Sequence, residues 1–161
     1  MRLIFTLLVV AAALFVWLTS ASLAPVVASH FGASGTANGF MPRAAYLSLM
    51  LPLVVLVPIL VAASGQLARF FPASLVNLPN REYWLAPERR ASTASQLGRL
   101  ALFPASVLLL FLCFVHWQVV QANLSPSKQL TPGPFWAGLV LFAVAVGAWL
   151  VVLHRRFSRV R

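Results

Sequence analysis

Long runs of apolar residues alternate with short, polar, turn-rich segments along this chain of 161 residues. A helix needs about 20 mostly apolar residues to cross the roughly 30 Å hydrocarbon core of a bilayer. Four runs meet this length, at residues 3–23, 44–67, 97–120 and 135–153. Because the bilayer core holds no water, each run must satisfy its own backbone hydrogen bonds as a helix. The pattern predicts an all-α fold, a bundle of four transmembrane helices.

The length of the chain suits one small domain, so we expect a single membrane domain over residues 1–161. These segments cover residues 24–43, 68–96 and 121–134, and a tail covers residues 154–161. Pro52, Pro58 and Pro104 are expected to kink the second and third spans, since each removes an internal hydrogen bond.

Composition agrees with a chain dissolved in lipid. Hydrophobic residues make up 61% of the sequence and charged residues 9%, whereas soluble domains average about 25% charged. The net charge of +10 does not indicate nucleic-acid binding, because that function needs a basic face on a folded soluble domain.

Charge placement predicts the orientation. Ten of the twelve lysines and arginines lie before the first span, around the segment 68–96 or after the last span. Only Arg43 and Lys128 lie on the opposite side. Since positive loops stay in the cytoplasm, both termini are expected to be cytoplasmic, and segments 24–43 and 121–134 to lie outside. The alternative for the first span is a signal peptide cleaved after Ala24, which leaves the segment 25–43 outside as well.

The first outer segment, PVVASHFGASGTANGFMPR, is the most patterned part of the chain. Asn38-Gly39 predicts a tight turn, because both residue types tolerate positive φ. The segment is therefore expected to form a compact loop or small hairpin over the outer face of the bundle. It is either a structural cap or a binding site for a ligand or partner. The candidate binding residues are Pro25, His30, Phe31, Gly35, Asn38, Gly39 and Arg43.

No catalytic or metal-binding pattern is present in the sequence. His30 and His116 are the only histidines expected at the outer side, and both acidic residues, Glu82 and Glu88, lie on the other side. Two histidines without a carboxylate or thiolate fall short of a zinc site. We therefore expect no enzyme, metal or cofactor, and interpret His116 as an interfacial side chain hydrogen-bonded to a neighbouring helix.

The cytoplasmic segment 68–96 combines helix breakers, aromatic rings and arginines. It is expected to anchor at the membrane interface, where amphipathic rings and cations are favourable, or to dock a cytoplasmic partner. Pro87 followed by Glu88 predicts the start of a helix that leads into the third span. The residues that define this interfacial loop are Asn77, Pro79, Asn80, Tyr83, Trp84, Pro87, Arg89 and Arg90.

Two motifs resemble the DUF1648 domain of bacterial membrane proteins. The first is P-x4-H-F-x3-G-x2-N-G-x3-R over residues 25–43, and the second is NLPNREYWLAPERR over residues 77–90. The chain departs from the family in having Arg43 where lysine is frequent and Gly32 where a polar residue is usual. It also lacks the further membrane half, with its Arg-x-x-x-Trp motif, of the larger SdpI-type immunity proteins.

The resemblance implies a non-catalytic multi-pass protein of the bacterial inner (cytoplasmic) membrane, with an immunity-like or signalling-like role. Its outer loop is expected to bind a peptide, lipid or protein partner. One alternative is an accessory subunit of a larger membrane complex or a homo-oligomer, with the helices as the interface. A metal-dependent membrane enzyme that uses His30 and His116 is the less favoured alternative.

Overall fold

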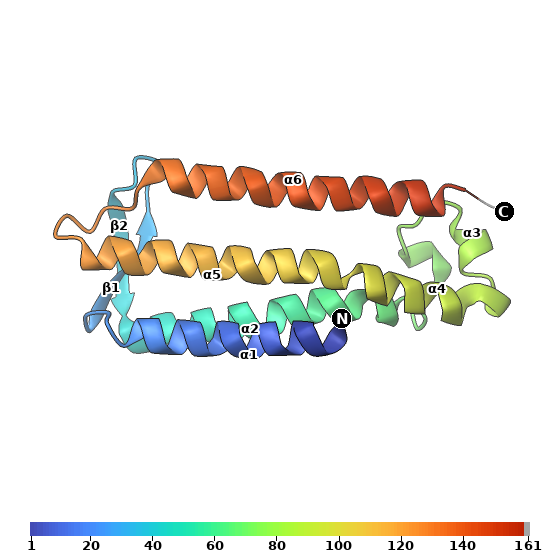
Figure 1. The fold of residues 1–161 in the computed structure, drawn as a ribbon, viewed down its shortest axis with the longest axis horizontal. Helices are drawn as coiled ribbons and strands as arrows, with labels where there is room; N and C mark the ends of the chain where they lie inside the picture. Colours follow the sequence, from blue (N-terminus) through green and yellow to red (C-terminus); the bar gives the residue numbers. More distant parts are fainter. Residues whose placement is uncertain (160–161) are drawn as a thin grey trace.

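The computed structural model describes residues 1–159, so the last two residues of the predicted tail lie outside the described chain. The fold is mostly helical, and four helices are long and apolar enough to cross a membrane, which confirms that part of the prediction. The apolar stretches lie in α1 (Arg2–Ser20), α2 (Arg43–Leu67), α5 (Leu102–Leu124) and α6 (Pro132–Phe157) (Figure 1). Helix α4 (Pro87–Leu100) leads directly into α5 and begins at the predicted proline.

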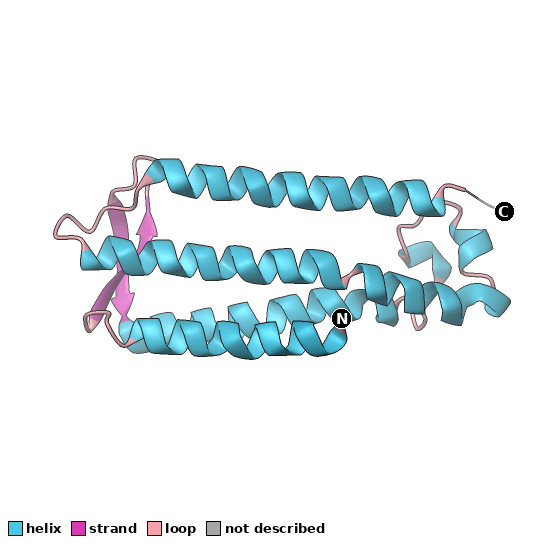
Figure 2. Ribbon diagram, viewed as in Figure 1, coloured by secondary structure: helices cyan, strands magenta, loops and turns pink. Residues whose placement is uncertain are grey.

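The fold is not purely helical, because the segment between α1 and α2 forms an antiparallel hairpin of β1 (Val26–Phe31) and β2 (Ala37–Pro42). Figure 2 shows this hairpin at one end of the helices and the short helix α3 (Arg81–Trp84) at the other. A 3-10 turn, η1 (Ala73–Leu75), precedes α3. The all-α class therefore needs one correction: this segment forms a hairpin, one of the two forms expected for it, because strand pairing satisfies backbone groups that lie outside the helices.

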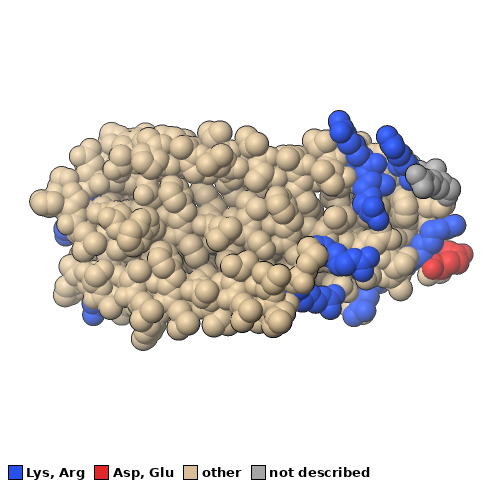
Figure 3. Space-filling view, in the orientation of Figure 1, with Lys and Arg blue, Asp and Glu red and all other residues tan. Residues whose placement is uncertain are grey.

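Charged side chains gather at the end of the molecule that carries α3 and α4, and the hairpin end carries few (Figure 3). We call these two ends the charged end and the hairpin end. The separation follows from the sequence, because the four apolar runs are nearly free of charge and the arginines lie at their ends or in the segments between them.

The core lies among α1, α2 and α5, where Val16, Val54 and Leu109 are almost completely buried. Helix α6 lies outside this core and packs along α5 (Figure 1). The approach is close at Gly138, where an added Cβ would lie 2.4 Å from the Phe114 ring. Of the residues of α6, only Phe157 at its end is buried.

The prolines act differently in the two helices that contain them. Helix α2 runs as one helix through Pro52 and Pro58, whereas the third span is divided at Ala101, between α4 and α5. Pro104 has no N–H for the carbonyl of Leu100, four residues earlier. The indole N–H of Trp149 in α6 donates to that carbonyl at 3.0 Å. A side chain from the neighbouring helix thus replaces the hydrogen bond that proline removes.

Candidate functional site

The hairpin is fastened to the bundle by one amide side chain. Asn123, near the end of α5, accepts a hydrogen bond from the N–H of Ala28 at 2.9 Å and donates to the carbonyl of Ala28 at 2.8 Å. Its amide group also donates to the carbonyl of Val119. Because Ala28 is fully buried, both of its backbone groups need partners. Asn123 therefore pairs with β1 much as a neighbouring strand would.

The hairpin turns at residues 32–36, and the predicted turn at Asn38-Gly39 was wrong. Gly35 has φ +83°, and its carbonyl accepts the N–H of Leu130 at 2.9 Å. Asn38 and Gly39 lie within β2 instead. Gly39 pairs with His30 across the hairpin, and a Cβ at position 39 would lie 2.9 Å from the Cβ of His30. The glycine is thus required by close cross-strand approach and not by a turn.

The base of the hairpin is closed by Arg43, the first residue of α2. Its backbone N–H donates to the carbonyl of Pro25 at 2.9 Å. Its guanidinium donates to the carbonyls of Leu23 at 3.0 Å and Ala21 at 3.4 Å. These carbonyls follow the end of α1, where backbone acceptors lack partners within the helix and a cation is favourable. In this structure Arg43 joins α1 to the hairpin.

A groove of about 410 Å³ lies between the hairpin, α5 and the start of α6. Three of the candidate binding residues, His30, Phe31 and Gly35, line it, whereas Pro25, Asn38, Gly39 and Arg43 do not. Its lining is mainly apolar, with the polar side chains of Ser29 and His30 at the strand. The other lining residues are Gly32, Ala33, Val115, Val119, Leu130, Pro132, Phe135 and Trp136.

His30 presents one ring nitrogen to its own neighbour and keeps the other free. The side chain is exposed, and its Nδ1 lies 3.0 Å from the hydroxyl of Ser29. In the described part of the chain, Nε2 has no hydrogen-bond partner. His30 is therefore able to donate to, or accept from, a polar group of a ligand in the groove.

Beneath the hairpin, a buried polar cluster joins three helices. His116 of α5 is fully buried, and its Nδ1 lies 2.8 Å from the hydroxyl of Tyr46 in α2. Its Nε2 lies 2.8 Å from the hydroxyl of Thr19 in α1, and that hydroxyl lies 2.6 Å from the carbonyl of Phe15. The expectation of a hydrogen bond to a neighbouring helix is confirmed, and the side chain lies inside the bundle.

The cluster determines which nitrogen of His116 carries the proton. The Thr19 hydroxyl has a single hydrogen, and the carbonyl of Phe15 can only accept it. Thr19 must then accept a hydrogen bond from Nε2–H of His116, so Nδ1 accepts from the Tyr46 hydroxyl. Both nitrogens are therefore engaged within the protein, and neither is free for a metal ion in this conformation.

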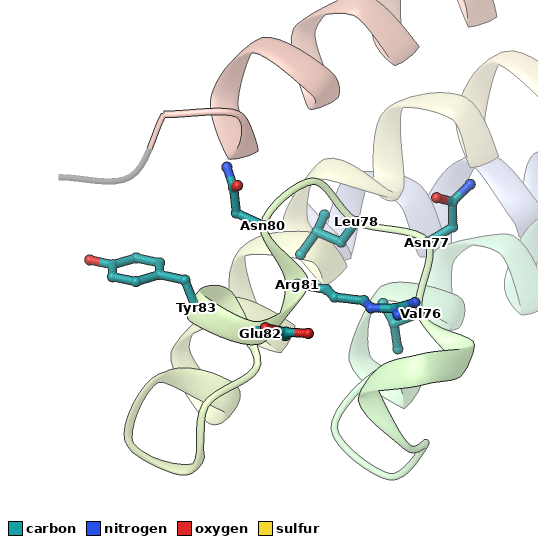
Figure 4. Close-up of a pocket in the computed structure, with 7 residues that line it drawn as sticks. All are labelled: Val76, Asn77, Leu78, Asn80, Arg81, Glu82 and Tyr83. Carbon is teal, nitrogen blue, oxygen red and sulfur yellow. The ribbon is translucent and has the colours of Figure 1, made fainter.

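At the charged end, the loop between α2 and α4 holds the last turn of α6. Asn80 has a left-handed backbone (φ 50°), and its side chain donates to the carbonyls of Phe157 and Ser158 at 3.2 and 3.0 Å. The indole N–H of Trp84 donates to the carbonyl of Phe157 at 2.8 Å, and the ring packs edge-on against Phe157. Figure 4 shows the Asn80 side chain pointing toward the end of α6.

The other residues of this loop are held mainly by its own backbone and rings. Arg90 donates to the carbonyl of Phe71, and the guanidinium of Arg89 lies 4.0 Å from the centre of the Tyr83 ring. Asn77 lines a hollow beside α3 together with Asn80 and Tyr83 (Figure 4). Pro79 precedes the left-handed Asn80, and Pro87 is the first residue of α4.

The sequence interpretation missed Thr19, Tyr46 and Asn123, which make long-range polar contacts at the hairpin end. Their only signal is a polar side chain within or beside an apolar run, and such residues usually face a partner helix. Comparison with protein-family models, curated proteins and solved structures found no match to this chain.

Proposed function

We propose that the chain is a non-catalytic, multi-pass membrane protein that binds a lipid-like amphiphile in the groove at the hairpin end. The supporting observation is the groove itself, whose volume of about 410 Å³ lies within the usual range for ligand sites, roughly 300–1,000 Å³. Its walls hold the apolar chain of the ligand, and the free nitrogen of His30 hydrogen-bonds its head group.

A lipid fits the groove better than the other partner classes, a peptide or a protein. Phe31, Val115 and Phe135 make the lining largely apolar. The groove lies where apolar helices end, at the depth where lipid head groups meet acyl chains in a bilayer. The exposed Trp136 beside it, 51% accessible, is typical of that interface.

The proposal also includes the orientation of the protein in the membrane and the identity of that membrane. The ten cations that the sequence holds before the first span, around the segment 68–96 and after the last span support a cytoplasmic location for the charged end and both termini, with the hairpin end outside. The proposed membrane is the bacterial inner membrane and the proposed family type is DUF1648, on the strength of the two motifs. An immunity-like or signalling-like role then means that ligand capture at the hairpin end is the protein's task.

Orientation is tested with single cysteines in a Cys113→Ala background. Ser34→Cys lies in the hairpin turn and Ser92→Cys in α4, so the pair reports the two ends of the molecule. A membrane-impermeant maleimide applied to intact cells is expected to label position 34 and to spare position 92. Labelling of position 92 alone would reverse the orientation.

Ligand binding is tested with a photoreactive palmitic acid, cross-linked to the purified protein in neutral detergent and mapped by mass spectrometry. Val115→Trp fills the groove, and Val144→Trp on the exposed face of α6 is the matched control. We expect cross-links in residues 29–36 and 115–136 that Val115→Trp abolishes and Val144→Trp retains. His30→Ala is expected to weaken binding about tenfold, as for the loss of one hydrogen bond to a charged group.

Two outcomes would contradict the lipid assignment. One is equal cross-linking in the two tryptophan variants, which would place the probe outside the groove. The other is an integral or exported protein that co-purifies with the wild type from native membranes and is lost with Val115→Trp, which would make the partner a protein.

The second candidate function, an accessory subunit of a membrane complex, is favoured by α6. This helix packs on α5 alone among the long helices, and none of its apolar stretch is buried. A subunit that packs on this face would be lost with Val144→Trp and retained with Val115→Trp, the reverse of the result expected for the groove. The same two variants therefore separate the candidates.

A further inference from the structure

A second cleft lies at the charged end of the molecule, and its polar lining consists mainly of hydrogen-bond donors. It has a volume of about 560 Å³ and lies between α3, α4 and the end of α6. The residues that line it are Tyr83, Trp84, Gln96, Arg155, Arg156 and Arg159. Three guanidiniums, one amide and two rings thus share one concave surface, and none of the described lining residues is an aspartate or glutamate.

The last turn of α6, next to the arginines, is held in place by hydrogen bonds to the loop between α2 and α4. Phe157 lies between two of the arginines in sequence, is fully buried, and has its carbonyl held by Asn80 and Trp84. This contact fixes the last turn of α6 against the loop. Arg156 is oriented further, because it donates to Oε1 of Gln96 in α4 at 2.8 Å.

The guanidiniums keep most of their donors free. Each has five N–H groups, and Arg156 uses one of them on Gln96. Within the described residues, Arg155 and Arg159 make no hydrogen bond or ion pair, and neither Glu82 nor Glu88 pairs with any of the three. The negative end of the α6 dipole offsets only about half a charge, so the cleft retains a strong positive potential.

We propose that this cleft binds a phosphate group, with the guanidiniums of Arg155, Arg156 and Arg159 as its donors. Arginine matches phosphate oxygens with paired N–H bonds, and Trp84 and Tyr83 supply the walls. The cleft begins where the apolar run of α6 ends, at Leu153. This depth favours the head group of an anionic phospholipid over a soluble phosphate.

The test titrates the full-length protein, in neutral detergent, with dioleoyl phosphatidylglycerol and counts bound lipid by native mass spectrometry. Dioleoyl phosphatidylcholine is the comparison lipid, because its choline cation opposes the arginines. We expect one phosphatidylglycerol to bind at least about tenfold more tightly than phosphatidylcholine. Each arginine contributes about fivefold, so Arg155→Gln/Arg156→Gln should weaken binding on the order of 25-fold.

The matched control is Arg69→Gln/Arg99→Gln, which removes the same charge from just after α2 and from α4, outside the cleft. Its affinity for phosphatidylglycerol should equal that of the wild type. Gln96→Glu gives a second variant that keeps the contact with Arg156, since a carboxylate oxygen accepts the same N–H. It places a negative charge in the cleft and should also weaken binding.

Inorganic phosphate distinguishes the two sources of the group. Displacement of phosphatidylglycerol by submillimolar phosphate would support the phosphate site and assign a soluble ligand to it. No displacement at that concentration would support the phospholipid. Two results would overturn the proposal, because either means that no specific site exists. One is an equal loss of phosphatidylglycerol affinity in the cleft and control variants, and the other is equal affinity of the wild type for the two lipids.

Discussion

The hydrogen bond between Tyr46 and His116 provides a direct energetic test of the bundle. The two side chains are buried, to 6% and 0% exposure, and their polar atoms lie 2.8 Å apart. Tyr46→Phe removes only the hydroxyl, and the phenyl ring keeps its stacked contact with the imidazole. The substitution therefore leaves Nδ1 of His116 without a donor while the packing is unchanged.

The expected loss of unfolding free energy follows from the cost of leaving a buried polar group unpaired. Leaving one buried polar atom without a partner costs about 1–3 kcal/mol, and pairs within membrane helices couple by about 0.6 kcal/mol on average and about 1.7 at most. We expect Tyr46→Phe and His116→Leu each to lower the free energy of unfolding by about 1–2 kcal/mol. The double variant removes both orphaned atoms, so its loss should fall short of the sum by about 1 kcal/mol.

The assay is unfolding by titration with sodium dodecyl sulfate in mixed micelles, followed by circular dichroism, for all four members of the cycle. Tyr83→Phe at the charged end is the matched control, and its combination with His116→Leu should be additive. A coupling below about 0.3 kcal/mol between Tyr46 and His116 would refute the reasoning, because independent sites add within that margin.

Three further predictions concern single positions. Gly35→Ala should prevent the hairpin from closing, because φ is +83° and the new Cβ would meet the carbonyl oxygen of Leu130 at 2.0 Å; Gly133→Ala, which meets nothing within 4 Å, should behave as wild type, and protease sensitivity of the turn distinguishes the two. Asn123→Leu should release β1 from α5 at a cost of about 1–3 kcal/mol and raise amide hydrogen exchange in residues 26–31, and unchanged exchange would contradict its anchoring role. Trp149→Phe should lower the unfolding free energy by about 0.5–1.5 kcal/mol, because it removes the hydrogen bond to the carbonyl of Leu100 at the α4–α5 break. An equal loss of unfolding free energy in a Pro104→Ala background would show that the indole does not replace the missing N–H.

The candidate groove could be predicted only in part. His30, Phe31 and Gly35 were recognised because a patterned polar segment stands out between apolar runs, and they do line the groove. Its opposite wall comes from α5 and α6, about a hundred residues away in sequence, and no local pattern pairs those positions with the hairpin. Asn38-Gly39 was assigned to a turn because turn propensity is a local property. The hairpin turns instead at residues 32–36, where the carbonyl of Gly35 accepts a hydrogen bond from Leu130, outside the segment.

The sequence by itself determined the helices and the segregation of charge. Apolar runs of bilayer length must be helical wherever they pack, since no other partner for their backbone exists in lipid. Pro87 likewise marked the start of α4, because a fixed φ and a missing N–H suit a first helical turn. Tertiary structure decided the roles of individual polar side chains: Arg43 holds the end of α1, His116 joins three helices, and Asn80 and Trp84 hold the end of α6. These bonds join residues 20 to 97 positions apart. A donor buried in the bundle takes the acceptor that helix packing places beside it, and a residue type alone does not say which acceptor that is.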